Sequence, residues 1–415
     1  MASSLTWLDY SERDRRRALD VIDLFRETGT VDELGLGAVR DSFSDLFFPG
    51  TSTTQTRACY FLLVPWTFRR LERSRVSSNE AEERFRREEL LLSEHLLKGD
   101  DTGGVFGAQA GAGLKRLPSE AYWGGLGSWR IHTFPSHKWA YFRSLDGFYR
   151  RLAQFGQTPR DPEGRIAPPA NWHAHLPEPP PGFPRNGVTV ALRRKDAEYL
   201  RDRIQAQHPQ SLLSVVAQRA NGTDLQAAWP WEFSGLEDTP ATLRERLHDA
   251  ELFAVSMQGA ALLYNLMLSE QQPNKHRVDR IERYQRELTE WAGDLTALEA
   301  DLRDWQLDGV WQTVRAGGRS LGYPTRSFVQ SWVEELQRNG PTAIVHDESG
   351  ARVLVKRREA QVKPGRARLT NPRHLELWGG ESGTGRMEYR WGPAKRILQD
   401  IFDGLVRSEG DAEDT

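Results

Sequence analysis

The sequence predicts an α+β fold that is predominantly α-helical. Apolar residues recur at helical spacing over long stretches, most clearly in residues 242–268. Shorter apolar stretches at 57–66, 342–345 and 352–357 lack that spacing and indicate strands. A proline-rich segment, residues 158–186, shows neither periodicity and is expected to separate two domains.

Several domains are expected, because 415 residues exceed the size at which one hydrophobic core stops growing. The predicted divisions are an amino-terminal α+β domain (1–157), a proline-rich linker (158–186), a helical domain (187–306), a winged-helix-like basic segment (307–407) and a disordered tail (408–415).

In the amino-terminal domain, amphipathic spacing predicts helices at 13–27, 36–47, 79–98 and 146–154. The unbroken apolar run before Pro65 predicts a buried strand at 57–66. Cys59 lies in that run, so we expect a buried apolar side chain rather than a reactive thiol. Ser119 is expected to cap the amino terminus of a further helix.

Beyond the proline-rich segment, further helices are predicted at 194–207, 211–218, 242–268, 274–305, 308–315 and 326–338. The last two are followed by the predicted hairpin of 342–345 and 352–357 around the turn 347–350. Two helices followed by a hairpin resemble a winged-helix DNA-binding domain.

Composition restricts the function classes. The net charge of −2 gives no overall attraction to nucleic acid or to anionic lipid. No apolar run approaches the length that crosses a bilayer, so a cytoplasmic protein without membrane contact is expected. The single cysteine excludes an intrachain disulfide and a cysteine-based zinc cluster.

A glycine-rich stretch at 103–116 fails the test for a phosphate loop. Such a loop needs glycine directly before lysine and a hydroxyl residue after it, whereas Leu114 and Arg116 flank Lys115. One interpretation is a loop whose glycines permit unusual backbone angles. The other is contact of Lys115, Arg116 and Ser119 with a phosphate or a partner protein.

No catalytic residue, metal site or cofactor is predicted. The pair His173 and His175 lacks a third ligand of matching spacing, and His132 with His137 is expected in a loop or a core. A restriction-type nuclease would carry an acid two residues before Lys356, where Leu354 stands instead.

The densest charge is a basic block near the carboxy terminus. Its cations are Arg352, Lys356, Arg357, Arg358, Lys363, Arg366, Arg368 and Arg373, and Glu359 alone interrupts them. Such density favours binding to nucleic-acid phosphates, against the alternative of a solvated surface in an arginine-rich chain. In the helix at 326–338, Arg326, Gln330 and Arg338 are candidates for the groove-facing side.

Several segments together resemble an uncharacterised bacterial family, a domain of unknown function. They are residues 5–11, 34–41, 48–52, 61–66, 117–123 and 365–369, spread over most of the chain. The resemblance implies an association with helicases and phospholipase-D-like nucleases in phage-defence islands. It assigns no catalytic residue.

The first hypothesis is therefore a non-catalytic subunit of a defence complex that contacts DNA or RNA and acts with a helicase or a nuclease. The second is a protein-only scaffold without nucleic-acid contact. The third is a metal-dependent nuclease assembled from scattered acids such as Asp41, Asp45 and Asp347.

Overall fold

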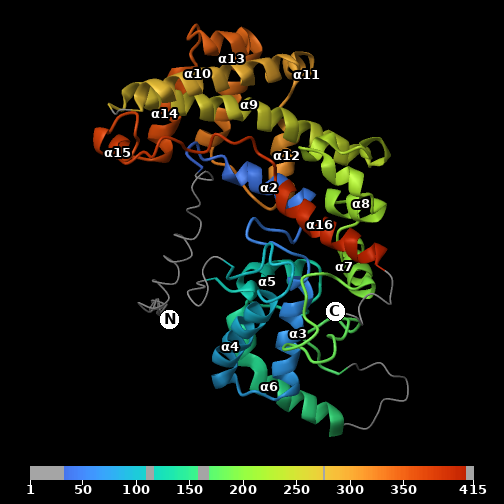
Figure 1. The fold of residues 1–415 in the computed structure, drawn as a ribbon. Helices are drawn as coiled ribbons and strands as arrows, with labels where there is room; N and C mark the ends of the chain where they lie inside the picture. Colours follow the sequence, from blue (N-terminus) through green and yellow to red (C-terminus); the bar gives the residue numbers. More distant parts are fainter. Residues whose placement is uncertain (1–31, 109–115, 158–167, 274–275, 408–415) are drawn as a thin grey trace, which may run out of the picture. The chain divides into compact units, whose positions relative to one another are not determined.

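A computed structural model of the protein describes residues 32–108, 116–157, 168–273 and 276–407 (Figure 1). Helix accounts for 64% of the structure, and the described residues form no strand. The predominantly helical class is therefore confirmed, whereas the β part of the α+β class is not. The predicted helix at 13–27 and the tail from 408 lie outside the described residues.

The α-helices in chain order are α2 (Gly37–Phe47), α3 (Tyr60–Arg73), α4 (Ser78–Leu96), α5 (Pro118–Ser128), α6 (Lys138–Gln157), α7 (Arg194–Gln207), α8 (Leu212–Arg219), α9 (Ala241–Gln271), α10 (Arg277–Thr296), α11 (Glu299–Asp304), α12 (Asp308–Ala316), α13 (Tyr323–Val345), α14 (Ala351–Val362), α15 (Pro372–Glu376) and α16 (Trp391–Val406). Three short 3-10 helices, η2 (Gly222–Gln226), η3 (Pro230–Glu232) and η4 (Leu236–Asp238), precede α9.

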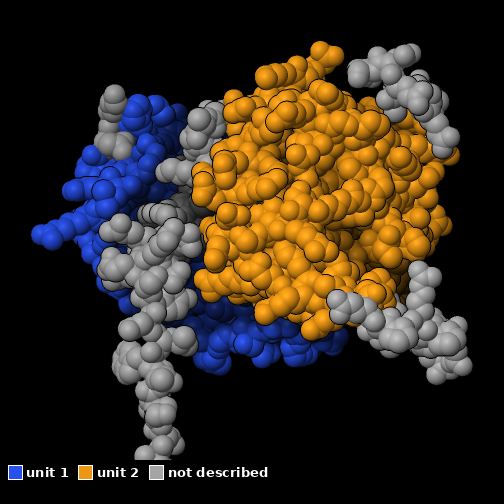
Figure 2. Space-filling view, turned by 90° about the horizontal axis from the view of Figure 1, so that it is seen from below, with its two compact units in different colours: residues 1–42, 248–387 blue, residues 43–247, 388–415 orange. Residues whose placement is uncertain are grey.

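The described residues divide into two compact units, coloured separately in Figure 2. Unit 1 takes the residues up to 42 and 248–387, and unit 2 takes 43–247 and the residues from 388 onward. Each unit thus combines two stretches that are distant in sequence. The described part of the predicted linker lies within unit 2, where Trp172 and Leu176 are buried.

In unit 2 the prediction of a strand at 57–66 is wrong, because α3 occupies most of this stretch. Every residue of α3 from Tyr60 to Phe68 is buried. A helix that is buried on all sides needs apolar residues on all sides, so its sequence shows no helical period and resembles a buried strand. Cys59 is buried just before the helix, as predicted.

Aromatic side chains hold the helices around α3 together. α3 packs against α4 and α5. Phe68 of α3 stacks on Phe85 of α4, and Phe61 stacks on Trp129, each with ring centroids 3.9 Å apart. The Trp129 indole also donates to the Pro49 carbonyl at 2.9 Å, so this large ring is buried with its polar group satisfied.

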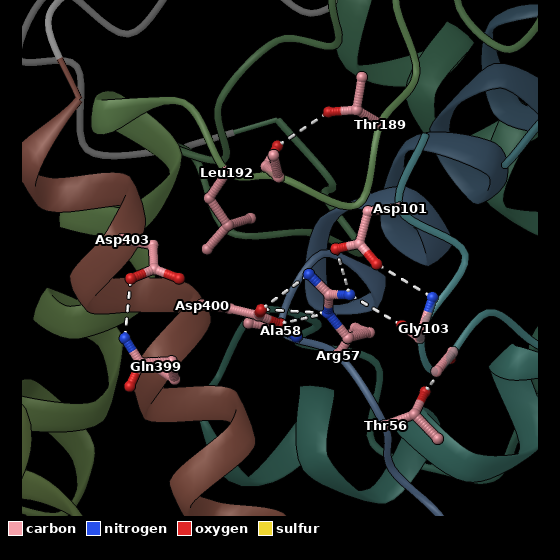
Figure 3. Close-up of polar contacts among 12 residues, drawn as sticks. Thr56, Arg57, Ala58, Asp101, Gly103, Thr189, Leu192, Gln399, Asp400 and Asp403 are labelled. Atoms are coloured by element: carbon pink, nitrogen blue, oxygen red, sulfur yellow. Dashed lines mark hydrogen bonds and ion pairs between the residues drawn. The ribbon is translucent and has the colours of Figure 1, made fainter. Parts of the chain in front are cut away.

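The helix α16 returns the end of the chain to unit 2. It packs against α7 and α8 (Figure 1), and its Asp400 is buried. The Asp400 carboxylate accepts from the Arg57 Nε at 3.0 Å and from the Ala58 backbone N–H at 2.7 Å (Figure 3). Arg57 also donates to Asp101 and Gly103, so one guanidinium joins three segments.

In unit 1, α10 and α13 are hydrogen-bonded to α9, which forms where the sequence predicts a helix at 242–268. Trp291 of α10 donates to the Val255 carbonyl at 2.7 Å, and Trp332 of α13 donates to the Ser256 carbonyl at 2.9 Å. The Trp291 ring lies so close to Gly259 that an added Cβ would fall 2.1 Å from it. Only glycine permits this close approach of the two helices.

α9 is also the one helix of the described chain that is long and apolar enough to cross a membrane, so the prediction that no apolar run approaches this length is wrong. Its most apolar window is 89% buried within the structure. A soluble protein's core helix passes the same test of length and composition, so this burial is consistent with a soluble protein.

The winged-helix prediction fails at its hairpin. α12 and α13 form where helices were predicted, but 342–345 ends α13 and 352–357 lies in α14. The buried positions of α14 include Ala351, Val355 and Arg358, which follow helical spacing. The stretch 352–357 was predicted to be a strand, but it lies within this helix, where Val355 is buried and Val353 is 70% exposed.

We predict that Asp400→Ala destabilises the protein by about 2–3 kcal/mol. The change removes the main partner of Arg57 and leaves the buried Ala58 N–H without an acceptor. Urea unfolding followed by circular dichroism measures the loss.

The matched control is Asp403→Ala, one turn along the same helix. Asp403 is exposed and bonds to Gln399 (Figure 3), so its removal should change the free energy of unfolding by less than about 0.5 kcal/mol. Equal losses in the two variants would show that the Arg57–Asp400 contact contributes nothing specific.

Candidate nucleic-acid interface

Two arginines of the basic block are engaged within unit 1. Arg352 forms a bidentate pair with Glu270 at 2.6 and 2.9 Å, and the hydrogen bond to Glu270 raises its pKa. Arg358 is buried and donates to the Leu34 carbonyl at 2.7 Å and to the Thr325 hydroxyl at 2.8 Å. Burial lowers the pKa of Arg358. Because its guanidinium is buried and hydrogen-bonded, Arg358 is a structural cation rather than a surface charge.

Two further cations converge on the buried carboxylate of Glu33. Arg368 donates to Glu33 at 2.8 Å, and Lys363 contacts its other oxygen. Burial, and to a smaller extent the charge of Arg368, lowers the pKa of Lys363 to about 8. These two cations therefore neutralise an internal acid and contribute little to the surface charge.

Glu359 fixes the loop after α14 against that helix. Its buried carboxylate accepts from the backbone N–H groups of Arg368 and Leu369, at 2.7 and 2.9 Å, and from the Tyr264 hydroxyl at 2.6 Å. The one acid of the basic block is thus an internal anchor. It holds the loop that carries Arg366 next to the helix that carries Lys356 and Arg357.

The remaining four cations of the block are exposed, and we call them the exposed cation set: Lys356, Arg357, Arg366 and Arg373. Lys356 and Arg357 lie on α14, Arg366 in the loop that Glu359 anchors, and Arg373 on α15. In the described part of the chain, no carboxylate lies within ion-pair distance of any of them. Their charges face solvent.

The three polar residues predicted to lie on one side of the helix at 326–338 are all exposed on α13. Arg326, Gln330 and Arg338 are exposed, while Phe328 and Trp332 are buried. The Arg326 guanidinium lies over the Trp311 ring, 5.2 Å from its centroid. Gln330 donates to Glu334 at 3.1 Å, so part of this side is already engaged in a local contact.

Ser119 is not placed to bind a phosphate. It is fully buried at the second position of α5, whose cap position is Leu117, so the predicted Ser119 cap is wrong. Its hydroxyl donates to Glu89 at 2.8 Å and accepts from the Lys138 ammonium at 2.9 Å. Arg116 is half-buried, and Lys115 lies outside the described residues.

The acids and histidines considered for metal chemistry are engaged elsewhere. Asp41 pairs with Arg40, Asp45 with Arg390 and Asp347 with Arg352. His173 lies 3.0 Å from an Arg203 nitrogen and 3.3 Å from the Tyr199 hydroxyl. Over the described ranges, no three residues of metal-binding type gather into a ligand set.

Sequence reasoning missed two residues that shape this surface. Glu33, which binds two of the cations, lies 335 residues from Arg368 in the chain. Tyr323, at the first position of α13, is 81% exposed. Neither has a local sequence signal, because one is defined by a distant partner and the other by its exposure.

A comparison with family models matches residues 2–404 to a family of unknown function, DUF6361. The chain belongs to this family, as the resemblance of its sequence motifs implied. No match was found among curated proteins or among solved structures.

We predict that Glu89 makes stability depend on pH. Burial raises the pKa of Glu89 from 4.5 to about 7, although Lys138 opposes the shift. Folding therefore favours the protonated acid. Its stabilising contribution is complete below the unfolded-state pKa and is lost as the pH rises through about 7, by on the order of 3 kcal/mol at about 1.4 kcal/mol per pKa unit.

Urea unfolding between pH 5 and pH 8 tests this prediction against two variants. Glu89→Gln cannot ionise and should show a flatter dependence than the wild type, whereas Glu83→Gln, an exposed neighbour on α4, should follow the wild type. Parallel curves for the wild type and Glu89→Gln would contradict the assignment.

Proposed function

We propose that this member of the family DUF6361 is a non-catalytic subunit that binds the phosphates of DNA or RNA through the exposed cation set. The single observation behind the proposal is the division within the basic block. Arg352, Lys363 and Arg368 are neutralised by acids of unit 1, whereas Lys356, Arg357, Arg366 and Arg373 face solvent without such partners among the described residues.

Arginine abundance alone does not account for this division. Some arginines on other helices pair locally, as Arg283 does with Glu287 on α10 and Arg84 with Glu88 on α4, whereas others, such as Arg86 on α4, are exposed. From 352 to 373 the sequence carries eight cations and one acid, in a chain whose net charge is −2. The local excess is therefore independent of the overall charge.

Such a surface binds polyanions by releasing their condensed counterions, so affinity depends steeply on salt. The contact requires no sequence-specific groove, since phosphates are recognised by charge. Arg326 and Arg338 on the exposed side of α13 are the candidates for extending it. A winged-helix mode of reading bases is not part of the proposal, because the wing is helical.

The setting we propose is the cytoplasm, in a phage-defence complex with a helicase or a phospholipase-D-like nuclease. The resemblance of the sequence motifs supports this setting, and a partner enzyme would supply the chemistry. The alternative is a protein-only scaffold, which predicts partner binding without any affinity for nucleic acid. A metal-dependent nuclease has less support, because Asp41, Asp45 and Asp347 each pair with an arginine.

We predict that replacing the exposed cation set by alanine weakens binding to DNA and flattens its salt dependence. Because the variant can no longer neutralise the phosphates that these four side chains bind, the slope of log affinity against log salt should fall by about three to four. Fluorescence anisotropy of a labelled oligonucleotide, titrated from about 50 to about 200 mM salt, measures both quantities.

The matched control replaces Arg86, Arg143, Arg150 and Arg151, which are exposed on unit 2, and removes the same charge. It should bind almost as the wild type does, while both variants unfold at the wild-type temperature. An equal loss in the two variants would mean that net charge alone matters. A wild-type protein without affinity for DNA or RNA at low salt favours the scaffold.

A further inference from the structure

Tyr323 is exposed at a place where the fold does not require an aromatic ring. Its side chain is 81% exposed, the only aromatic among the strongly exposed large apolar side chains of the described chain. Elsewhere in unit 1 the aromatic side chains are buried, as Trp291 and Trp332 are against α9. A ring left in water loses the burial energy that the others gain.

The start of α13, which carries Tyr323, is joined by Arg358 to the helix α14 that carries part of the exposed cation set. Arg358 of α14 donates to the hydroxyl of Thr325, in the first turn of α13, at 2.8 Å. Tyr323 precedes Thr325 by two residues, and Arg357 precedes Arg358 by one. The start of α13 is therefore within one side-chain length of the helix that carries Lys356 and Arg357.

The same turn of α13 also carries a flat cation. Arg326 is exposed and its guanidinium lies over the Trp311 ring, 5.2 Å from the centroid, which orients the planar group. A planar aromatic ring, a planar cation and further cations that face solvent are the elements of sites for single-stranded nucleic acid. Bases stack on the rings there while the cations follow the backbone.

Resting on the proposed function, we infer that the nucleic acid is single-stranded and that Tyr323 stacks on one of its bases. The exposed cation set holds the phosphates on either side. A duplex keeps its bases stacked within the helix, so it offers the same phosphates to the cations but no base face to Tyr323.

The experiment compares Tyr323→Ala with the wild type on three probes of about 12 nucleotides: a thymidine strand, an abasic strand and a duplex. Tyr323→Ala should bind the thymidine strand about tenfold more weakly, within the range expected for loss of one base–aromatic stack, and the other two probes unchanged. Tyr323→Phe and Tyr323→Trp should retain the wild-type affinity, since both keep a ring.

The outcomes separate this inference from the proposed function. If Tyr323→Ala binds the thymidine strand as the wild type does, while loss of the exposed cation set weakens all three probes, the stacking role is overturned and the phosphate contact stands. Equal weakening on all three probes also overturns it. If the wild type binds none of the probes at low salt, the proposed function fails and the inference fails with it.

Discussion

The buried carboxylate of Glu359 is the constraint on which the candidate interface depends. It satisfies two backbone N–H groups of the following loop and a tyrosine hydroxyl of α9 at once. A buried acid is costly unless each of its oxygens is well bonded, and here both are. The position of the loop relative to α14 is therefore fixed by hydrogen bonds rather than by apolar packing alone, and the cations on both elements share that frame.

The same unit shows how a cation-rich sequence divides its charges. Arginines whose partners lie inside become structural, as Arg358 does by joining α13, α14 and the segment before α2. Other cations, such as Lys356 and Arg357, remain exposed at the surface. The chemical identity of a residue does not decide between these roles. Whether an arginine is structural or exposed depends on which carboxylates and carbonyls the fold places within hydrogen-bonding distance of it.

Much of the helical content could be predicted from sequence, and α7 matches its predicted bounds residue for residue. The predictions failed where burial on all sides removed the helical period, as in α3, and where a short apolar stretch was assigned to a strand, as in α14. The site was predictable only as a concentration of charge. Glu270 lies 82 residues from Arg352 and Glu33 lies 335 from Arg368, so no local pattern shows which cations are neutralised.

The contact of Arg57 with Asp400 also has a consequence for the order of synthesis. The two residues are separated by 343 positions, and the whole second stretch of unit 1 lies between them. On the ribosome, α3 and its neighbours emerge long before α16 is translated. Arg57 therefore has no contact with Asp400 while residues 248–387 of unit 1 are being synthesised. Synthesis of unit 2 thus begins before residues 248–387 and ends after them. Its last helix, α16, supplies the Asp400 that binds Arg57.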